Sequence, residues 1–273
     1  MLYLEHNPQP ALAPFIKTLW YACDPHATHR HERVLPTGRA QIVLSLARDY
    51  LTDASNPINP LEHSPAGIFL GIYSRHQQID AIDFTELIGI AFHPGGTAAF
   101  FPEDAHIFTN CETSLSDLWG RASLNLRNDL REAPTPEQKF ALLEFVLLTR
   151  LSLSKHQHRD PIIDYALTHL HTSPGTTTIA ELTRTTGLSP RRLSERFNQL
   201  VGVSPKLYCR IQRFQQALQQ MHRGADVHWA ELALNCGYYD QSHFANDFRA
   251  FSGLSATDYS TTNRIWANHI PLD

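Results

Sequence analysis

The last third of the chain carries one sequence pattern twice. The segment AELTRTTG at 180–187 corresponds to AELALNCG at 230–237, an offset of 50 residues. Beyond the turn the offset becomes 51, so that Phe197 corresponds to Phe248. One residue inserted in the second turn accounts for the change. A unit of this length that occurs twice predicts two copies of a helix-turn-helix.

The first copy has explicit helix start and stop signals. Thr178 and Glu181 form a predicted capping box, and Gly187 ends the short helix that follows. Ser189 and Pro190 then begin the next helix as N-cap and first helical residue. Helical spacing puts the apolar side chains of that helix on one face and the polar ones on the other. The inner residues are Leu193, Phe197, Leu200 and Val201, and the outer residues are Arg191, Ser194, Glu195 and Asn198.

In the second copy, Asp240 is the predicted N-cap of a helix in which aromatic rings alternate with polar residues. The two classes fall on different faces of this helix. Phe244, Phe248 and Phe251 point inward, and Gln241, Ser242, Ala245, Asn246 and Arg249 point outward. The outward positions lie near the helix N-terminus, which is the part of a recognition helix that reaches base edges in the major groove.

A third helix connects the two copies. Ser204 and Pro205 are its start signal, and we expect it to run to about Arg223. At about 1.5 Å per residue this helix spans about 27 Å. With the flanking helices, that length suits two recognition helices in successive major grooves, about 34 Å apart along DNA.

The charge of the chain is unevenly distributed. Its net charge of −4 argues against a uniformly basic surface. From Ser189 to Arg223, however, seven basic residues stand against Glu195 alone, an island that is typical of a localised phosphate-binding surface. A solvated helix face is the alternative interpretation. The second unit is acidic, so we expect the first unit to supply most of the affinity for DNA. Its charged residues are Asp226, Glu231, Asp240, Asp247 and Asp258 against Arg249.

With these features, residues 161–260 resemble the DNA-binding domain of the AraC/XylS family of bacterial transcription regulators. The family pattern is matched by Ala233, Gly237, Tyr238, Asp240, Ser242, His243, Phe244, Phe248, Arg249, Gly253, Ser255 and Tyr259, and in the connecting helix by Pro205, Tyr208, Arg213 and Ala217. Ala256 stands where the family usually has proline, which predicts a looser start of the last helix.

The resemblance implies that the outward residues of both recognition helices face DNA. In the first helix these are Arg191, Arg192, Ser194 and Glu195, and in the second they are Gln241, Ser242, His243, Ala245 and Asn246. Arg191 could donate two hydrogen bonds to guanine, and Glu195 could accept a hydrogen bond from cytosine. Gln241 or Asn246 could form a hydrogen-bonded pair with adenine. A phosphate contact or plain solvent exposure is the alternative for each. Candidate phosphate contacts are Arg196, Lys206 and Arg249. Arg196, and Arg213 in the connecting helix, could each either stabilise the fold or face a phosphate.

The first half of the chain predicts strands followed by helices. The segments 42–46, 66–73 and 86–92 are short apolar runs bounded by glycine or proline, with a proline-bearing loop at 52–65. Later the periodicity becomes helical. The helix predicted at 135–151 is so apolar that it must be covered on several sides, either in the core or at a subunit interface.

A polar segment at 152–160 separates the two halves, and Asp160 and Pro161 begin the next helix. We therefore predict a sensor or dimerisation domain at 1–155 and the double helix-turn-helix domain at 156–273. The expected fold class is α+β: a β-rich domain with trailing helices, then an all-α domain whose two units are joined by a long helix. The resemblance implies a cupin-like first domain. RVLPTGRAQIVLSL, GIAFHPGGTAAFF and SLSDLWG also resemble an uncharacterised domain that is often fused to this DNA-binding unit.

The histidines of the first half raise the question of a metal site. His26, His29 and His31 lie close together, and HxH spacing suits two ligands on one strand face. We favour a polar loop there, and expect no metal and no cofactor. His63, His76 and His93 are scattered. Beside His93, the segment Gly95–Gly96 indicates a tight turn rather than an anion nest.

Two other classes of protein also combine a DNA-binding unit of this kind with a second activity. A metal-dependent cupin enzyme fused to a DNA-binding unit would need a compact set of histidines and carboxylates on its strands, and the strand candidates supply few. A DNA-alkyl acceptor would need a reactive cysteine in a basic setting. The four cysteines form no CxxC pair, and none has the Pro-Cys-His context of such acceptors. We expect neither class, and no catalytic residue.

Composition places the chain among ordinary globular proteins, with 42% hydrophobic and 18% charged residues. It has no apolar run of about 18 residues and no N-terminal basic start before an apolar core. We therefore expect a cytoplasmic protein with reduced thiols and no membrane segment. The expected partners are double-stranded DNA, a small-molecule effector of unknown identity and a second copy of the chain, with RNA polymerase as a further candidate.

Overall fold

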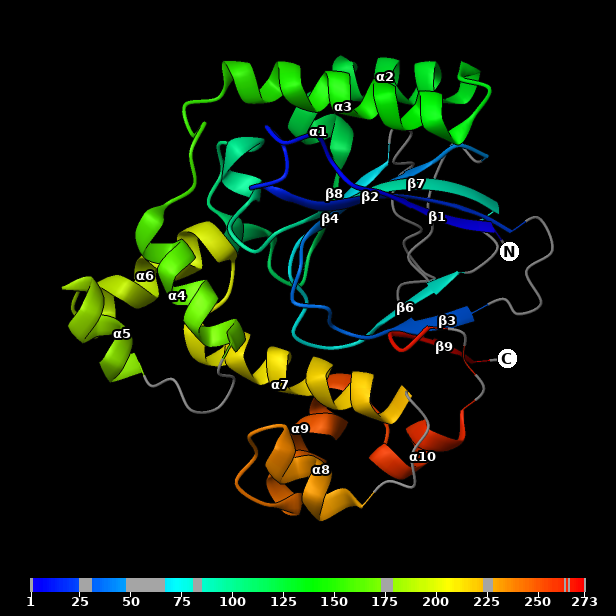
Figure 1. Cartoon of the computed structure of the whole chain (residues 1–273). Coiled ribbons are helices and arrows are strands. Elements are labelled where there is room, and N and C mark those ends of the chain that lie inside the picture. Colours follow the sequence, from blue (N-terminus) through cyan, green and yellow to red (C-terminus); the bar gives the residue numbers. More distant parts are fainter. Residues whose placement is uncertain are drawn as a thin grey trace.

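The structure is a computed structural model that describes residues 2–24, 31–47, 67–80, 85–172, 179–222, 228–262, 264 and 266–272. Its first half contains a six-stranded antiparallel sheet in the order β1-β2-β7-β4-β5-β8 (Figure 1). The strands are β1 (Leu2–His6), β2 (Ile16–Cys23), β4 (Gln41–Ser45), β5 (Ile68–Leu70), β7 (Glu86–Phe92) and β8 (Glu112–Ser114). The three apolar runs predicted as strands are β4, β5 and β7. The loop predicted at 52–65 lies outside the described residues.

Three helices cover one face of this sheet (Figure 1). They are α1 (Leu115–Trp119), α2 (Arg121–Glu132) and α3 (Pro136–Leu153). Leu143 and Leu147 of α3 are fully buried in the core between sheet and helices. The expectation that this apolar helix is covered on several sides is met only in part, because Phe145 remains 68% exposed.

The second half is helical and contains both expected helix-turn-helix units, α5–α6 and α8–α9, which share one continuous core with α7. The helices are α4 (Pro161–Thr172), α5 (Ile179–Thr186), α6 (Pro190–Val201), α7 (Pro205–His222), α8 (Trp229–Asn235), α9 (Gln241–Ser252) and α10 (Ala256–Thr261). Alanine at 256 does not leave the start of α10 uncapped, because Ser255 Oγ accepts a hydrogen bond from Asp258 N (3.0 Å). The α+β class is confirmed.

A second, three-stranded sheet joins the C-terminal end of the chain to two strands of the first half. Its order is β6 (Gln77–Asp80), β3 (His31–Val34) and β9 (His269–Pro271). The end of the chain therefore returns to the first half, which the sequence did not indicate.

The expectation of a polar loop at His31 was wrong, because His31 begins β3, while His26, His29 and His63 lie outside the described residues. The described part holds no group of three or more potential metal ligands. It also contains no helix long and apolar enough to cross a membrane.

Arg159 fastens the segment between the two halves to the first half. Its guanidinium donates to the carbonyl oxygens of Pro14 (2.9 Å) and Pro94 (2.7 Å) and pairs with Asp164. The tight turn predicted at Gly95–Gly96 is confirmed: Gly96 N donates to His93 O (2.8 Å), and Gly95 has a φ of +77°. The Arg159 charge therefore lies close to His93.

We expect His93 to make stability fall in mild acid. Burial first, and then the positive charges of Arg159, Arg39 and Lys17, lower the pKa of His93 to about 4. Between about pH 6.5 and pH 4, His93 is therefore protonated in the unfolded chain but neutral in the folded chain. As the pH decreases through this range, the free energy of unfolding decreases by at most about 1.4 kcal/mol per pH unit. Urea unfolding at pH 7 and pH 5 should show a smaller loss for His93→Gln than for the unaltered protein. Equal losses in both proteins would contradict this assignment.

Candidate DNA-binding surface

Local sequence signals position α6, the helix predicted to read DNA in the first unit. Ser189 Oγ accepts a hydrogen bond from Arg192 N (3.3 Å), and Pro190 is the first helical residue. Gly187, with a φ of +68°, ends α5 in the left-handed conformation that glycine tolerates. Leu193, Phe197 and Val201 are buried, so the inner face is as predicted. Thr178 of the predicted capping box lies outside the described residues.

The two predicted base contacts of α6 bind each other. Arg191 Nε donates to Glu195 Oε1 (2.8 Å), and the two side chains are 88% and 56% exposed. The hydrogen bond to Glu195, together with its charge, raises the pKa of Arg191. A pair this exposed contributes little to stability, so DNA can compete for either group. Arg192 is also exposed, and Ser194 is partly buried.

Arg196 has a structural role. Its Nε donates to Asp160 Oδ2 (2.7 Å), while Asp160 Oδ1 accepts from the backbone N of Ile162 and Ile163 (3.0 Å each). Asp160 therefore caps α4, as predicted, and ties that cap to α6. Of the candidate phosphate contacts, Lys206 is exposed at the start of α7.

The helix predicted to read DNA in the second unit, α9, is built in the same way. Asp240 Oδ1 accepts from His243 N (2.7 Å), and Gly253, with a φ of +71°, ends the helix. The inward and outward faces are as the sequence predicts. Phe244, Phe248 and Phe251 are buried, and Gln241, Ser242, Ala245, Asn246 and Arg249 are exposed. His243 is only partly exposed, with its ring against Tyr238.

An ion pair beneath α9 was not predicted. Asp247 is nearly buried and receives hydrogen bonds from Arg210 of α7, the shortest at 2.7 Å. This contact raises the pKa of Arg210, chiefly through the hydrogen bond. The charges of Arg210 and Asp247 therefore neutralise each other within the fold. The surface of the second unit is less acidic than the sequence suggests, and Arg210 no longer contributes its positive charge to the basic island. The sequence carried a signal for the burial of Asp247, which lies three residues after Phe244 and four before Phe251 on the inner face, but none for its partner Arg210.

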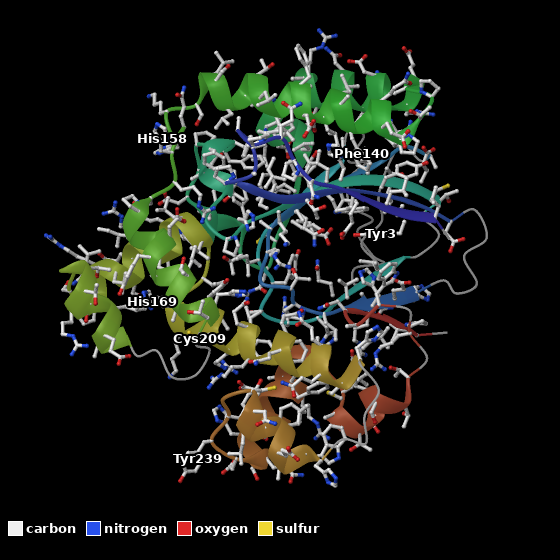
Figure 2. The ribbon with its side chains drawn as sticks, viewed as in Figure 1. Tyr3, Phe140, His158, His169, Cys209 and Tyr239 are labelled. Carbon is white, nitrogen blue, oxygen red and sulfur yellow. The ribbon has the colours of Figure 1, made fainter. Side chains whose placement is uncertain are left out.

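Arg213 also acts within the fold, which is the structural alternative considered for it. Its Nη1 donates to Gly237 O (3.1 Å), and its guanidinium lies 5.1 Å from the centre of the Tyr238 ring. It thus holds the turn that precedes α9. The neighbouring Tyr239 was not singled out from the sequence, although it is 86% exposed and projects from the α8–α9 unit (Figure 2). Its place in that turn makes it a further candidate DNA contact.

The helix α7 connects the two helix-turn-helix units and sets how their exposed faces lie. Ser204 Oγ accepts from Leu207 N (3.2 Å) and begins α7, which ends at His222 as the sequence predicts. The α6 helix leads directly into α7, whereas α8 and α9 pack along it (Figure 1). Each unit therefore holds an exposed polar helix face on a shared rigid element, an arrangement suited to two neighbouring segments of a DNA groove.

Two family models match the chain. Residues 182–262 match a helix-turn-helix domain, and residues 4–114 match a domain of unknown function (DUF6597). The first match spans both units, and the second runs from β1 to β8. No curated protein matches the chain.

Several solved structures resemble parts or most of the chain. The C-terminal domain of AraT, a response regulator from Geobacillus stearothermophilus, is 23% identical over 39% of this chain and 89% of its own, with a TM-score of 0.37. An AraC-type transcriptional regulator from Chromobacterium violaceum is 20% identical over 36% of this chain and 88% of its own, with a TM-score of 0.33. ToxT from Vibrio cholerae with a bound unsaturated fatty acid is 11% identical over 94% of this chain and 93% of its own, with a TM-score of 0.40.

Proposed function

We infer that this chain, whose C-terminal part is a DNA-binding helix-turn-helix domain of the AraC/XylS family, is a transcription regulator that reads its operator with both recognition helices. One observation carries the proposal. Two helices with matching N-caps and left-handed glycine ends expose polar faces, while their apolar faces share one core with α7. The base contacts proposed above for α6 and α9 all come from these exposed faces.

Replacement of Arg191 by alanine tests the reading role of α6. The operator is first located by footprinting the DNA upstream of the protein's own gene. Arg191→Ala should then weaken binding to that operator by about 1–3 kcal/mol, the value of one good base contact, with a smaller loss on random DNA of equal length. Mobility-shift titrations at fixed salt measure both losses. Arg121→Ala, which removes an exposed charge from α2, is the matched control. Equal losses on the two DNAs would make Arg191 a phosphate contact.

For the first half we propose a cupin-like sensor of a small-molecule effector. The sheet face turned away from α1–α3 supports this, because Val43, Ile68 and Leu87 form a separate apolar cluster there, with Trp20 at its side. Side chains alternate between the two faces of a strand, so this cluster is distinct from the helix-covered core. RNA polymerase is a second partner that we propose for a regulator of this kind.

We propose no catalytic activity. A DNA-alkyl acceptor depends on a reactive thiolate. Burial raises the pKa of Cys209, and that of Cys236 to about 11, which opposes thiolate formation at both positions. We also propose that the protein works in the cytoplasm, where these thiols stay reduced.

A dimer through α3 completes the proposal. Phe145 and Leu153 are large apolar side chains of this helix that remain 68% and 81% exposed, while Leu143 and Leu147 are buried. Light scattering at micromolar concentration should therefore give a dimer mass, and Phe145→Glu should reduce it to the monomer mass by placing a charge in the apolar contact. A monomer mass for the unaltered protein would contradict this part of the proposal.

A further inference from the structure

We propose that Arg33 and His76, two residues of the first half, are positioning residues that set the orientation of the second recognition helix. This inference rests on the proposed function, because it concerns how α9 is presented to DNA. It goes beyond that function by assigning part of the DNA-reading geometry to residues more than 150 positions away in the sequence.

Arg33 binds the C-terminal end of α9. Its Nη1 donates a hydrogen bond to the carbonyl oxygen of Ser252, the last residue of the helix (3.1 Å). The final carbonyls of a helix lack partners within the helix and carry partial negative charge, so a guanidinium is favourable there. Ser252 itself is fully buried, so water does not compete with Arg33 for this carbonyl.

His76 packs against the glycine that ends the same helix. A Cβ placed on Gly253 would lie 2.5 Å from His76 Cε1 and within 3.2 Å of both ring nitrogens. The ring therefore rests directly on the backbone at the helix end. Burial, and next the charge of Arg33, lower the pKa of His76, which favours the neutral ring beside that guanidinium.

The strand that carries Arg33 is itself held by the second half. β9 pairs with β3 in the register Arg33 to Ile270, and His269 Nδ1 lies 2.8 Å from Glu32 Oε2. The turn after β3 contacts α7, where Gln215 Nε2 donates to Pro36 O (2.6 Å). The three-stranded sheet is thus fastened both to α7, which precedes α9 in the sequence, and to β9, which follows it. The position of β3 is therefore linked to the position of the C-terminal end of α9.

These contacts position α9 without covering its reading face. Arg33 and His76 act on Ser252 and Gly253 at the C-terminal end, whereas the proposed base contacts lie in the first turns and remain exposed. A contact of this kind orients the helix rather than blocks it. Loosening it should therefore reduce the discrimination between bases by α9 and leave that by α6 unchanged.

The experiment measures base discrimination separately in the two halves of the footprinted operator. The half read by α9 is the one in which Asn246→Ala lowers discrimination against a substituted base. In that half, Arg33→Met should reduce discrimination from the roughly 5–150-fold of a good base contact to about threefold or less. The α6 half should keep its full value, and Arg33→Lys, which retains a charged donor, should restore most of the loss. Arg75→Met removes an exposed neighbouring charge and should change neither half.

A second variant, His76→Gln, should show the same selective loss, and it provides the test if Arg33→Met does not fold. Unchanged discrimination in the α9 half by a folded variant, equal losses in both halves, or tighter operator binding would each overturn the inference. An unaltered protein that discriminates in neither half would instead contradict the proposed function itself.

Discussion

Phe248→Ala is expected to lower the free energy of unfolding by about 3–5 kcal/mol, the usual cost of removing a fully buried phenylalanine ring. Phe248 of α9 is completely buried, and its ring lies 5.3 Å from that of Phe214 in α7 and 5.4 Å from that of Tyr259 in α10. The substitution leaves a cavity where three helices meet. Urea unfolding followed by far-ultraviolet circular dichroism measures the loss.

The adjacent residue provides the matched control. Arg249 is exposed, so Arg249→Ala should change stability by no more than about 0.5 kcal/mol. As a candidate phosphate contact, it should instead weaken binding to specific and random DNA alike. A loss of less than about 1 kcal/mol for Phe248→Ala would show that α9 is not held by this aromatic core.

Asp160→Ala should cost about 1–3 kcal/mol, because one carboxylate serves two purposes. It caps the backbone of α4, a role worth about 0.5–2 kcal/mol. It also pairs with Arg196 of α6, and a partly exposed ion pair adds about 0.2–1 kcal/mol. The loss should appear in urea unfolding as a lower midpoint.

Asp160→Asn separates the two roles. The amide oxygen still caps the helix, so this variant should lie within about 1 kcal/mol of the unaltered protein and above Asp160→Ala. If asparagine and alanine at this position cost the same, the ion pair with Arg196 and not the cap would account for the effect.

The helix-turn-helix units were predictable from sequence because their signals are local. Ser189, Asp240 and Gly253 cap or end a helix through contacts with residues only a few positions away. Apolar spacing then predicts which side of each helix is buried, and the structure agrees for both α6 and α9. Such signals depend on backbone geometry and need no knowledge of the rest of the fold.

The contacts that join distant segments could not be predicted in this way. β9 has three residues, too few for a recognisable alternation, and its partner β3 lies more than 200 positions earlier. The contact of Arg33 with Ser252 and that of Arg210 with Asp247 likewise exist only once the chain has folded. Counting charges along the sequence therefore overestimated how many are free to meet DNA.

The most direct test of the account is the ratio of affinities for the footprinted operator and for random DNA of equal length, measured by mobility shift at several salt concentrations. We expect the operator to bind about a thousandfold tighter or more at physiological salt, with both affinities falling as salt rises. Equal affinity for the two DNAs across the salt range would contradict the claim that α6 and α9 read a DNA sequence.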